Sequence, residues 1–160
     1  MTPSLTDRLL AYLQEQGADF TTMTHEPVRT SEEAARVRGT PLEQGAKAMV
    51  FRADDRIVLL VLPAHRRIDT RSFKKTHGIK NLQMVSAEEL MTLTGLEVGA
   101  VPPFGNLLGM PVYVDQGLTT LPRIAFNAGS RSASVVLATA DYLRLVQPIV
   151  DRFAAEDPAG

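Results

Sequence analysis

The stretch Gly45-Ala46-Lys47-Ala48-Met49-Val50-Phe51 holds a single charged residue in an otherwise apolar run. Such a run is typical of a β-strand, in which Lys47, Met49 and Phe51 share one face and the residues between them share the other. An ammonium group beside a protein core costs free energy unless it is paired or used. Lys47 is therefore either a functional cation or a strand-end lysine whose head reaches water.

A second apolar run, residues 56–62, follows the Lys47 strand after the polar pair Asp54-Asp55. This arrangement predicts a β-hairpin. Further strands are expected at residues 20–24, 81–85, 111–115, 122–127 and 133–138.

Helices are expected between these strands, because capping residues and glycines mark their ends. Leucine spacing predicts a first helix that ends at Gly17. Four more are expected to be capped by Thr30, Asp69, Ser86 and Thr139, and to end at Gly39, Gly78, Gly95 and about Val146. Strands mixed with short helices predict one α/β domain over residues 1–153, with a mixed sheet surrounded by helices, and a frayed tail over residues 154–160.

The composition of the 160 residues excludes several classes of protein. The chain has no cysteine, and therefore neither a disulfide framework nor a thiolate metal site. Its net charge of −1 argues against a protein that is basic all over. No apolar run reaches membrane-spanning length and the first residues do not resemble a signal peptide, which predicts a cytoplasmic protein without a membrane partner.

Common catalytic signatures are missing from the chain. There is no G-x-S-x-G, H-E-x-x-H, P-loop or G-x-G-x-x-G pattern. The three histidines, His25, His65 and His77, are not at metal-ligand spacing. We therefore expect no metal and no cofactor, although a triad assembled in space is not excluded by sequence.

Basic residues gather between residues 65 and 80, where Asp69 is the single acid. They could guide a polyanion such as RNA to one face, or they could form an ordinary solvated helix face. The candidate RNA-binding residues are Arg66, Arg67, Arg71, Lys74, Lys75 and Lys80.

Two further segments could serve a site. The glycines and paired prolines of residues 95–105 favour a rigid, shaped loop. Residues 126–131 have the form of a strand followed by a tight turn. That turn is either a simple hairpin connection or a place where backbone N–H groups approach a carbonyl or a phosphate.

These segments together resemble the YbaK/EbsC family, the free-standing relatives of the prolyl-tRNA synthetase editing domain. The resemblance runs from about Phe20 to Leu145. It includes the strand lysine, Leu62-Pro63 before Arg67-Ile68-Asp69, the loop Thr94-Gly95-x-x-Val98-Gly99-x-x-x-Pro103-x-Gly105, and the turn Asn127-Ala128-Gly129-Ser130-Arg131.

The resemblance implies a barrel-like mixed sheet and a hydrolase that removes a wrong amino acid from tRNA, with tRNA-Pro carrying a small or hydroxylated residue as the expected substrate. It implies Lys47 as the essential residue, positioning the ester for attack by water with help from the substrate's own hydroxyl. It implies the tRNA acceptor end as partner, with an aminoacyl-tRNA synthetase as a further one. The substrate-binding residues that it implies are Gly99, Ala100, Val101, Pro102, Pro103, Phe104, Gly105, Asn127, Ala128, Gly129 and Ser130.

The chain also departs from the family pattern. Ala48 follows Lys47 where members have Thr or Asn, and the turn is Asn127-Ala128-Gly129 rather than Ser-Gly-Gly. The reaction class therefore transfers better than the amino acid removed. The alternatives are a non-catalytic tRNA-binding or regulatory module of the same fold, or a small-molecule hydrolase that uses the same pocket.

Overall fold

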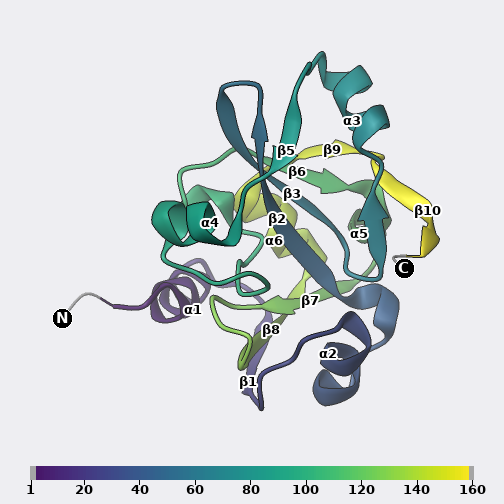
Figure 1. Ribbon diagram of the computed structural model, residues 1–160. Coiled ribbons are helices and arrows are strands. Elements are labelled where there is room, and N and C mark those ends of the chain that lie inside the picture. Colours follow the sequence, from purple (N-terminus) through teal and green to yellow (C-terminus); the bar gives the residue numbers. More distant parts are fainter. Residues whose placement is uncertain (1–2, 159–160) are drawn as a thin grey trace.

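Strands β2 (Ala46–Ala53) and β3 (Arg56–Pro63) form the hairpin expected around Lys47. They pair antiparallel along their whole length, from Ala46 opposite Pro63 to Ala53 opposite Arg56. The computed structural model describes residues 3–158, and in it this hairpin runs through the middle of the molecule (Figure 1).

The hairpin is the centre of a five-stranded sheet in the order β5-β2-β3-β6-β9. Its other strands are β5 (Leu82–Met84), β6 (Val112–Asp115) and β9 (Ile149–Asp151). The pairs β3–β6 and β6–β9 are parallel, whereas β2 pairs antiparallel with both β3 and β5. The prediction of an α/β fold with a mixed sheet is confirmed.

A second, antiparallel sheet has the order β1-β8-β7, from strands β1 (Phe20–Thr24), β7 (Arg123–Asn127) and β8 (Ala133–Ala138). A single bridge between Gly45 and Ala125 connects its edge to the start of β2. Within residues 3–158 the strands β1, β5 and β9 each keep an unpaired edge, so the sheets do not close into a barrel.

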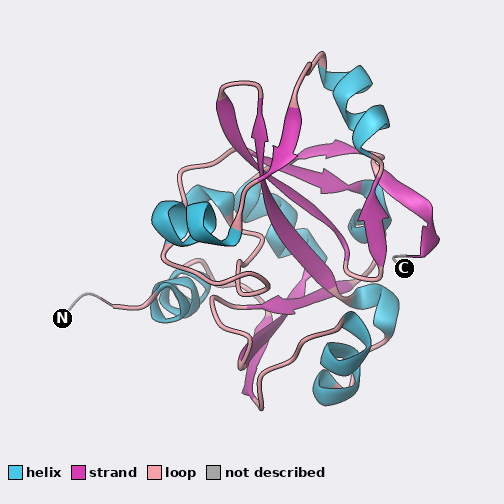
Figure 2. Ribbon diagram, in the orientation of Figure 1, coloured by secondary structure: helices cyan, strands magenta, loops and turns pink. Residues whose placement is uncertain are grey.

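Helices cover the outside of the sheets (Figure 2). Their bounds are α1 (Leu5–Glu15), α2 (Ser31–Arg38), α3 (Thr70–His77), α4 (Ala87–Thr94), α5 (Gln116–Thr119) and α6 (Thr139–Val146), with short 3-10 turns η1 (Leu42–Gln44) and η2 (Gly105–Leu107).

Three of the four predicted caps are confirmed. Thr30, Asp69 and Ser86 each accept a hydrogen bond from the backbone N–H three residues later. The prediction for Thr139 was wrong, because Ala138 occupies the cap position of α6 and the buried Thr139 hydroxyl has no hydrogen-bond partner within the described part of the chain.

The two faces of the β2–β3 hairpin bury different cores, as the alternation predicted. Ala46 and Val50 face the larger apolar cluster, which also contains residues of α1, α4, α6 and the second sheet. Phe51 faces a smaller cluster with Phe73 of α3 and Phe153. Both faces are therefore largely covered, and the first half of β2, where Lys47, Ala48 and Met49 are only partly buried, is the part left open to a site.

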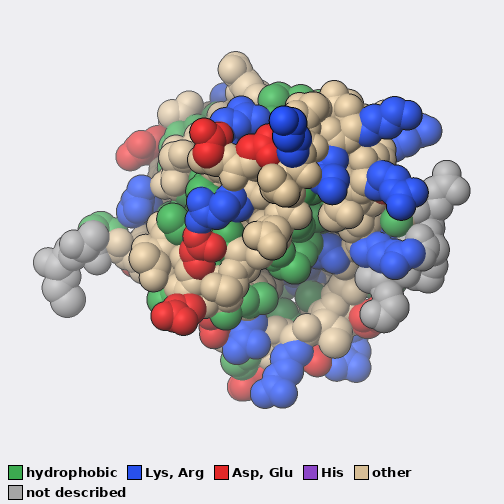
Figure 3. All heavy atoms as spheres, turned by 45° about the horizontal axis from the view of Figure 1, so that its top comes forward, with side chains coloured by type: hydrophobic (Ala, Val, Ile, Leu, Met, Phe, Trp, Pro, Cys, Tyr) green, Lys and Arg blue, Asp and Glu red, His purple; other side chains and the backbone are tan. Residues whose placement is uncertain are grey.

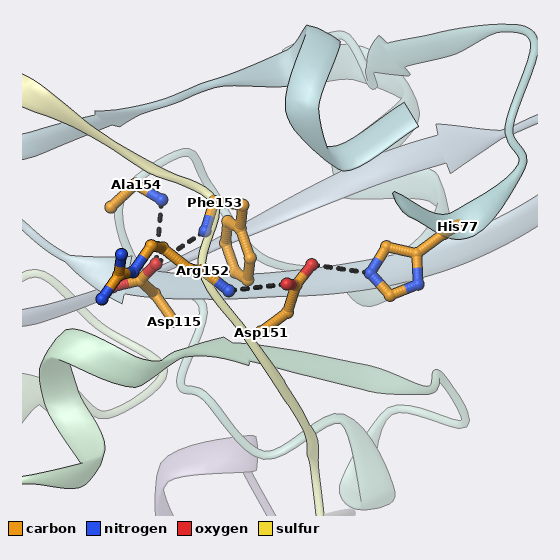
Figure 4. Close-up of polar contacts among 6 residues, drawn as sticks. All are labelled: His77, Asp115, Asp151, Arg152, Phe153 and Ala154. Carbon is orange, nitrogen blue, oxygen red and sulfur yellow. Dashed lines mark hydrogen bonds and ion pairs between the residues drawn. The ribbon is translucent and has the colours of Figure 1, made fainter. Parts of the chain in front are cut away.

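Residues 154–158 do not form the frayed tail that the sequence suggested. They form strand β10 (Ala154–Pro158), which pairs with β4 (Arg66–Ile68). Asp115, which is only 5% exposed, anchors this segment by accepting hydrogen bonds of 2.8 Å from the backbone N–H groups of Phe153 and Ala154 (Figure 4). The rest of the predicted tail, residues 159–160, lies outside the described residues.

The same C-terminal segment also contacts the basic helix α3. His77, at the end of α3, lies 2.8 Å from the carboxylate of Asp151, while the backbone N–H of Arg152 donates to that carboxylate at 2.7 Å (Figure 4). The His77 ring also packs against Phe73 and Tyr113.

Among the described residues, no helix has the length and the apolar character that a membrane-spanning helix requires.

Candidate active site

A cleft of about 460 Å³ opens where β2 begins. Its walls come from α2 and the residues before it, from the start of β2, from the loop around Gly99 and from the end of β7. Four basic residues line this cleft, and none of its described lining residues is acidic; the four are Arg29, Arg38, Lys47 and Arg131. Such a cleft favours an anionic ligand.

A smaller cavity of about 170 Å³ lies directly beside the cleft and shares Lys47, Val98, Gly99 and Val101 with it. Its remaining lining is apolar: Ala48, Met49, Val50, Met84, Val85 and Leu90. We call the larger space the basic cleft and the smaller one the apolar cavity. Lys47 lies at their junction.

Lys47 is half-buried, and burial lowers the pKa of its ammonium group below the ordinary 10.5. It makes no hydrogen bond or ion pair with another described residue. A structural lysine at a core surface would normally be paired or would extend into water. Its position at the junction of two cavities favours a functional cation.

A chain of hydrogen bonds fastens the far wall of the basic cleft. The guanidinium of Arg38 donates to the side-chain oxygen of Asn127 at 2.9 Å, and the side-chain nitrogen of Asn127 donates to the carbonyl oxygen of Gly99 at 2.7 Å. Arg38 also donates through Nε to the Ser134 hydroxyl at 2.9 Å. Burial lowers the pKa of Arg38 to about 10, so the guanidinium stays charged at neutral pH.

The structure brings only some of the predicted substrate-binding residues to the cavities. Gly99, Val101 and Asn127 line the basic cleft together with Lys47. Gly129 and Ser130 lie in the turn after β7 and do not line the basic cleft. The others are buried in the protein: Ala100, Pro102, Pro103, Phe104, Gly105 and Ala128.

Burial gives these residues a role in shaping the loop. Phe104 is completely buried and packs edge-on against Tyr12 and Tyr142. A side chain at Gly105 would overlap the carbonyl oxygen of Met110. Ala100 and residues 102–105 therefore support the loop from inside the core, while Gly99 and Val101 face the cavities.

The predicted RNA-binding residues lie on another part of the surface. Arg71, Lys74 and Lys75 lie on α3, and Arg66 and Arg67 lie on β4. Lys80 follows α3. Figure 3 shows Lys and Arg side chains gathered on the side of the molecule where α3 and β4 lie. None of the six lines the basic cleft.

A third pocket of about 540 Å³ lies next to the basic cleft, on the side of this basic surface. Its lining includes Pro63, His65, Arg66 and Arg152, while Ala64 of the same turn lines the basic cleft. One turn of chain thus separates the two spaces.

Sequence reasoning did not identify Arg29 or Arg38 as site residues. Arg38 is the last residue of α2, and its partner Asn127 is 89 positions away in the chain. No local pattern signals a contact over that separation. Within residues 3–158, no group of three or more His, Asp or Glu side chains is arranged to hold a metal ion.

Comparison with known proteins identifies the family. The family model of the aminoacyl-tRNA editing domain matches residues 25–145. The chain is 39% identical over 151 residues to the multifunctional Ser/Thr-tRNA deacylase ProXp-y of Escherichia coli strain K12, covering 91% of this chain and 90% of that protein. It is 30% identical over 101 residues to a proline–tRNA ligase of Caldicellulosiruptor bescii, of which the match covers 17%.

A solved structure described as a candidate trans-editing enzyme for prolyl tRNA synthetase has the same fold, with a TM-score of 0.84 over 97% of this chain and 99% of the other. At 24% identity, that likeness supports the fold alone. The match over residues 25–145 spans Lys47, the Gly99 loop and the turn after β7. The chain therefore belongs to the aminoacyl-tRNA editing domain family, as its sequence motifs predicted.

Proposed function

We propose that this protein is a trans-editing hydrolase that deacylates mischarged tRNA, with the seryl and threonyl esters of tRNA-Pro as its preferred substrates. The observation that carries the proposal is the meeting of the basic cleft and the apolar cavity at Lys47. The name of the Escherichia coli relative, a Ser/Thr-tRNA deacylase, supports the choice of a hydroxylated amino acid.

The two cavities suit the two parts of an aminoacyl-tRNA end. The basic cleft accepts the terminal adenosine and its phosphate, because its four cations favour an anion. The apolar cavity accepts the amino acid side chain, and its volume of about 170 Å³ restricts that side chain to a small one. In this arrangement the ester carbonyl lies at the junction, beside Lys47.

Lys47 then acts as a fixed positive charge. An aminoacyl ester is already reactive, so orientation and stabilisation of the developing negative charge are the main requirements for its hydrolysis. A charged Lys47 positions the ester or stabilises the oxyanion. A neutral Lys47 acting as general base is the competing role, which lowering of its pKa by burial would also favour.

Discrimination among amino acids follows from the size of the apolar cavity. One methylene group in such a pocket changes specificity by about 1–3 kcal/mol. Serine, threonine and alanine esters are therefore expected to react, while an ester with a bulky aromatic side chain is excluded by volume.

Contacts beyond the acceptor end are proposed for the basic residues of α3 and β4, which lie past the turn at Ala64. An acceptor strand leaving the basic cleft across this turn would approach Arg66. A synthetase partner could supply recognition of the tRNA body, and the similarity to a segment of a proline–tRNA ligase supports prolyl-tRNA synthetase as that partner.

A deacylation panel tests this function. Seryl, threonyl, alanyl, cysteinyl and prolyl esters of tRNA-Pro are incubated with the wild type, Lys47→Met, Lys47→Arg and the control Arg56→Met, which changes an exposed residue at the hairpin turn. We expect the wild type and the control to hydrolyse the seryl and threonyl esters. Both Lys47 variants should be inactive. Lys47→Met removes the charge, and in Lys47→Arg a planar guanidinium does not replace a point charge.

The outcomes separate the alternatives. Retained tRNA binding without hydrolysis of any ester would overturn the proposal in favour of a non-catalytic module. Equal turnover by wild type and folded Lys47→Met would remove Lys47 from the mechanism.

A further inference from the structure

Arg38 of α2 is connected to the end of β7 and, through Asn127, to the Gly99 loop, and these three segments are walls of the basic cleft. Its guanidinium donates to Ser134 of β8 and to Asn127 at the end of β7. Asn127 in turn donates to the carbonyl oxygen of Gly99 in the loop. A planar fork of N–H donors suits such a junction, because Nε and Nη2 point at two acceptors at once.

The hydrogen-bond roles along this chain have one consistent direction. Arg38 has only donors, so the side-chain oxygen of Asn127 must accept, which leaves its nitrogen to donate to Gly99. Ser134, 1% exposed, accepts from Arg38, and its hydroxyl lies 2.8 Å from Nε2 of His25. The side chains of Arg38 and Asn127 therefore each have a defined orientation, and the Ser134 hydroxyl lies within 3.5 Å of the Asn127 side-chain oxygen as well.

Arg38 is held by neutral acceptors alone. No described carboxylate pairs with it, and burial is the sole cause of its lowered pKa. A partly buried cation without a counter-ion costs free energy. That cost is offset when an anionic substrate enters a cleft which contains no acidic lining residue.

The hydrogen bonds from Arg38 to Asn127 and from Asn127 to Gly99 end at a residue beside Lys47, where the ester is proposed to react. Gly99 lines both cavities beside Lys47, and its backbone has φ of +89°, a conformation open to glycine because glycine has no Cβ atom. Since glycine can also adopt many other conformations, the hydrogen bond from Asn127 to its carbonyl oxygen restrains this part of the loop. Without Arg38, the Asn127 amide could rotate and release the Gly99 carbonyl.

We propose that Arg38 is a positioning residue of the deacylation reaction, acting through Asn127 to hold the Gly99 wall of the cleft against Lys47. This inference rests on the proposed function, since it assigns a further residue to the same site. It assigns no direct contact with the reacting ester to Arg38.

Kinetics of four variants test the proposal. Arg38→Met removes the donors, and Arg38→Lys keeps the charge but cannot bridge Ser134 and Asn127. Asn127→Asp keeps the acceptor for Arg38 but loses the donor to Gly99. Arg36→Met is the matched control, because Arg36 is an exposed arginine of the same helix.

We expect kcat for the seryl ester to fall about tenfold to a hundredfold in Arg38→Met and Asn127→Asp, as expected for a lost charge-assisted hydrogen bond. Arg38→Lys should recover only part of the loss, and Arg36→Met should match the wild type. Combining Arg38→Met with Asn127→Asp should add little, because both changes break one chain. Rates of Arg38→Met within twofold of the wild type, or additive losses, would overturn the proposal.

Amide hydrogen exchange separates failure of this inference from failure of the proposed function. If the wild type hydrolyses no ester, the function is wrong, yet exchange over residues 96–101 still reports on the link. Faster exchange there in Arg38→Met than in Arg36→Met supports the positioning role. Unchanged exchange contradicts it, and Asn127→Asp provides the same readout if Arg38→Met does not fold.

Discussion

Gly129 donates its backbone N–H to the carbonyl oxygen of Ala100 across 2.8 Å. This bond joins the turn after β7 to the Gly/Pro loop, two segments that were recognised separately in the sequence. Asn127 joins the same pair of segments through its bond to Gly99. The two motifs therefore form one unit, which presents Gly99, Val101 and Asn127 to the cavities and buries Phe104 and Ala128 in the core.

The pH dependence of turnover distinguishes the two roles of Lys47. Burial lowers its pKa below 10.5. If the charged form is needed, kcat/KM falls as pH rises through that lowered pKa, whereas a neutral general base would make kcat/KM rise there. Initial rates from pH 6 upward, corrected for spontaneous ester hydrolysis, measure this limb. An increase with pH would assign Lys47 to proton transfer.

The same pKa predicts a change in stability. Between the folded-state pKa and the unfolded-state pKa of Lys47, the unfolded chain binds more protons, so the free energy of unfolding rises with pH in that window. Lys47→Met should lack this rise and should be at least as stable as the wild type at neutral pH, because it removes a partly buried charge. Urea denaturation at neutral and alkaline pH tests both expectations. A large loss of stability in Lys47→Met would instead indicate a structural lysine.

Narrowing the apolar cavity should change the amino acid preference. Ala48 lines this cavity but not the basic cleft, and Val suits a strand position. Ala48→Val is expected to lower kcat/KM for the threonyl ester about tenfold more than for the seryl ester, since a methylene is worth about 1–3 kcal/mol in such a pocket. The seryl ester serves as internal control. An equal effect on both esters would place the amino acid side chain elsewhere.

Local patterns predicted the elements that this site is built on. Alternation around Lys47 gave the β2–β3 hairpin, and glycines and capping residues gave α2, α3 and α4. Those patterns do not determine whether the sheets close into the barrel-like arrangement that the family resemblance implied, and over the described residues the sheets stay open. Closure depends on pairing between strand edges far apart in the chain, and here the link is a single bridge between Gly45 and Ala125.

The site itself was only partly predictable. Lys47 stands out because it is the single charge in an apolar run, and Gly99 because it belongs to a loop rich in glycine and proline that matches the family motif. Arg38 has an ordinary place at the end of a helix, and its role arises from a contact made across 89 residues. Phe104 and Gly105 belong to the same loop motif as Gly99, yet the structure buries both. One sequence motif can thus contain site residues and packing residues, and the motif alone does not separate them.

The basic surface on α3 should contribute to RNA binding through its charge. Replacing both Lys74 and Lys75 by Ala is expected to weaken tRNA binding and to reduce the slope of log K against log salt by up to about 1 per lost phosphate contact. Binding titrations between low and moderate salt, with Arg56→Ala as control, measure the slope. A slope equal to that of the control would show that this helix is a solvated face.

Asp115 is expected to be a major contributor to stability. Its carboxylate accepts hydrogen bonds from the backbone N–H groups of Gly117, Phe153 and Ala154. Asp115→Ala leaves these donors without their acceptor and should lower the free energy of unfolding by about 3 kcal/mol. Urea denaturation tests this, with Asp55→Ala at the exposed hairpin turn as control. Equal stability of the two variants would contradict the anchoring role of Asp115.

Gly105 provides a test of which part of the loop serves the fold. A Cβ atom there would overlap the carbonyl oxygen of Met110 and the Cγ2 atom of Val112, so Gly105→Ala forces the backbone apart. We expect a loss of about 2 kcal/mol, typical of overpacking, with turnover per folded molecule unchanged. Gly99→Ala, at φ of +89° beside Lys47, should instead reduce turnover. Comparing melting temperature and kcat/KM in the two variants separates the roles. If Gly105→Ala kept wild-type stability but lost turnover, the buried end of the loop would have to contact the substrate.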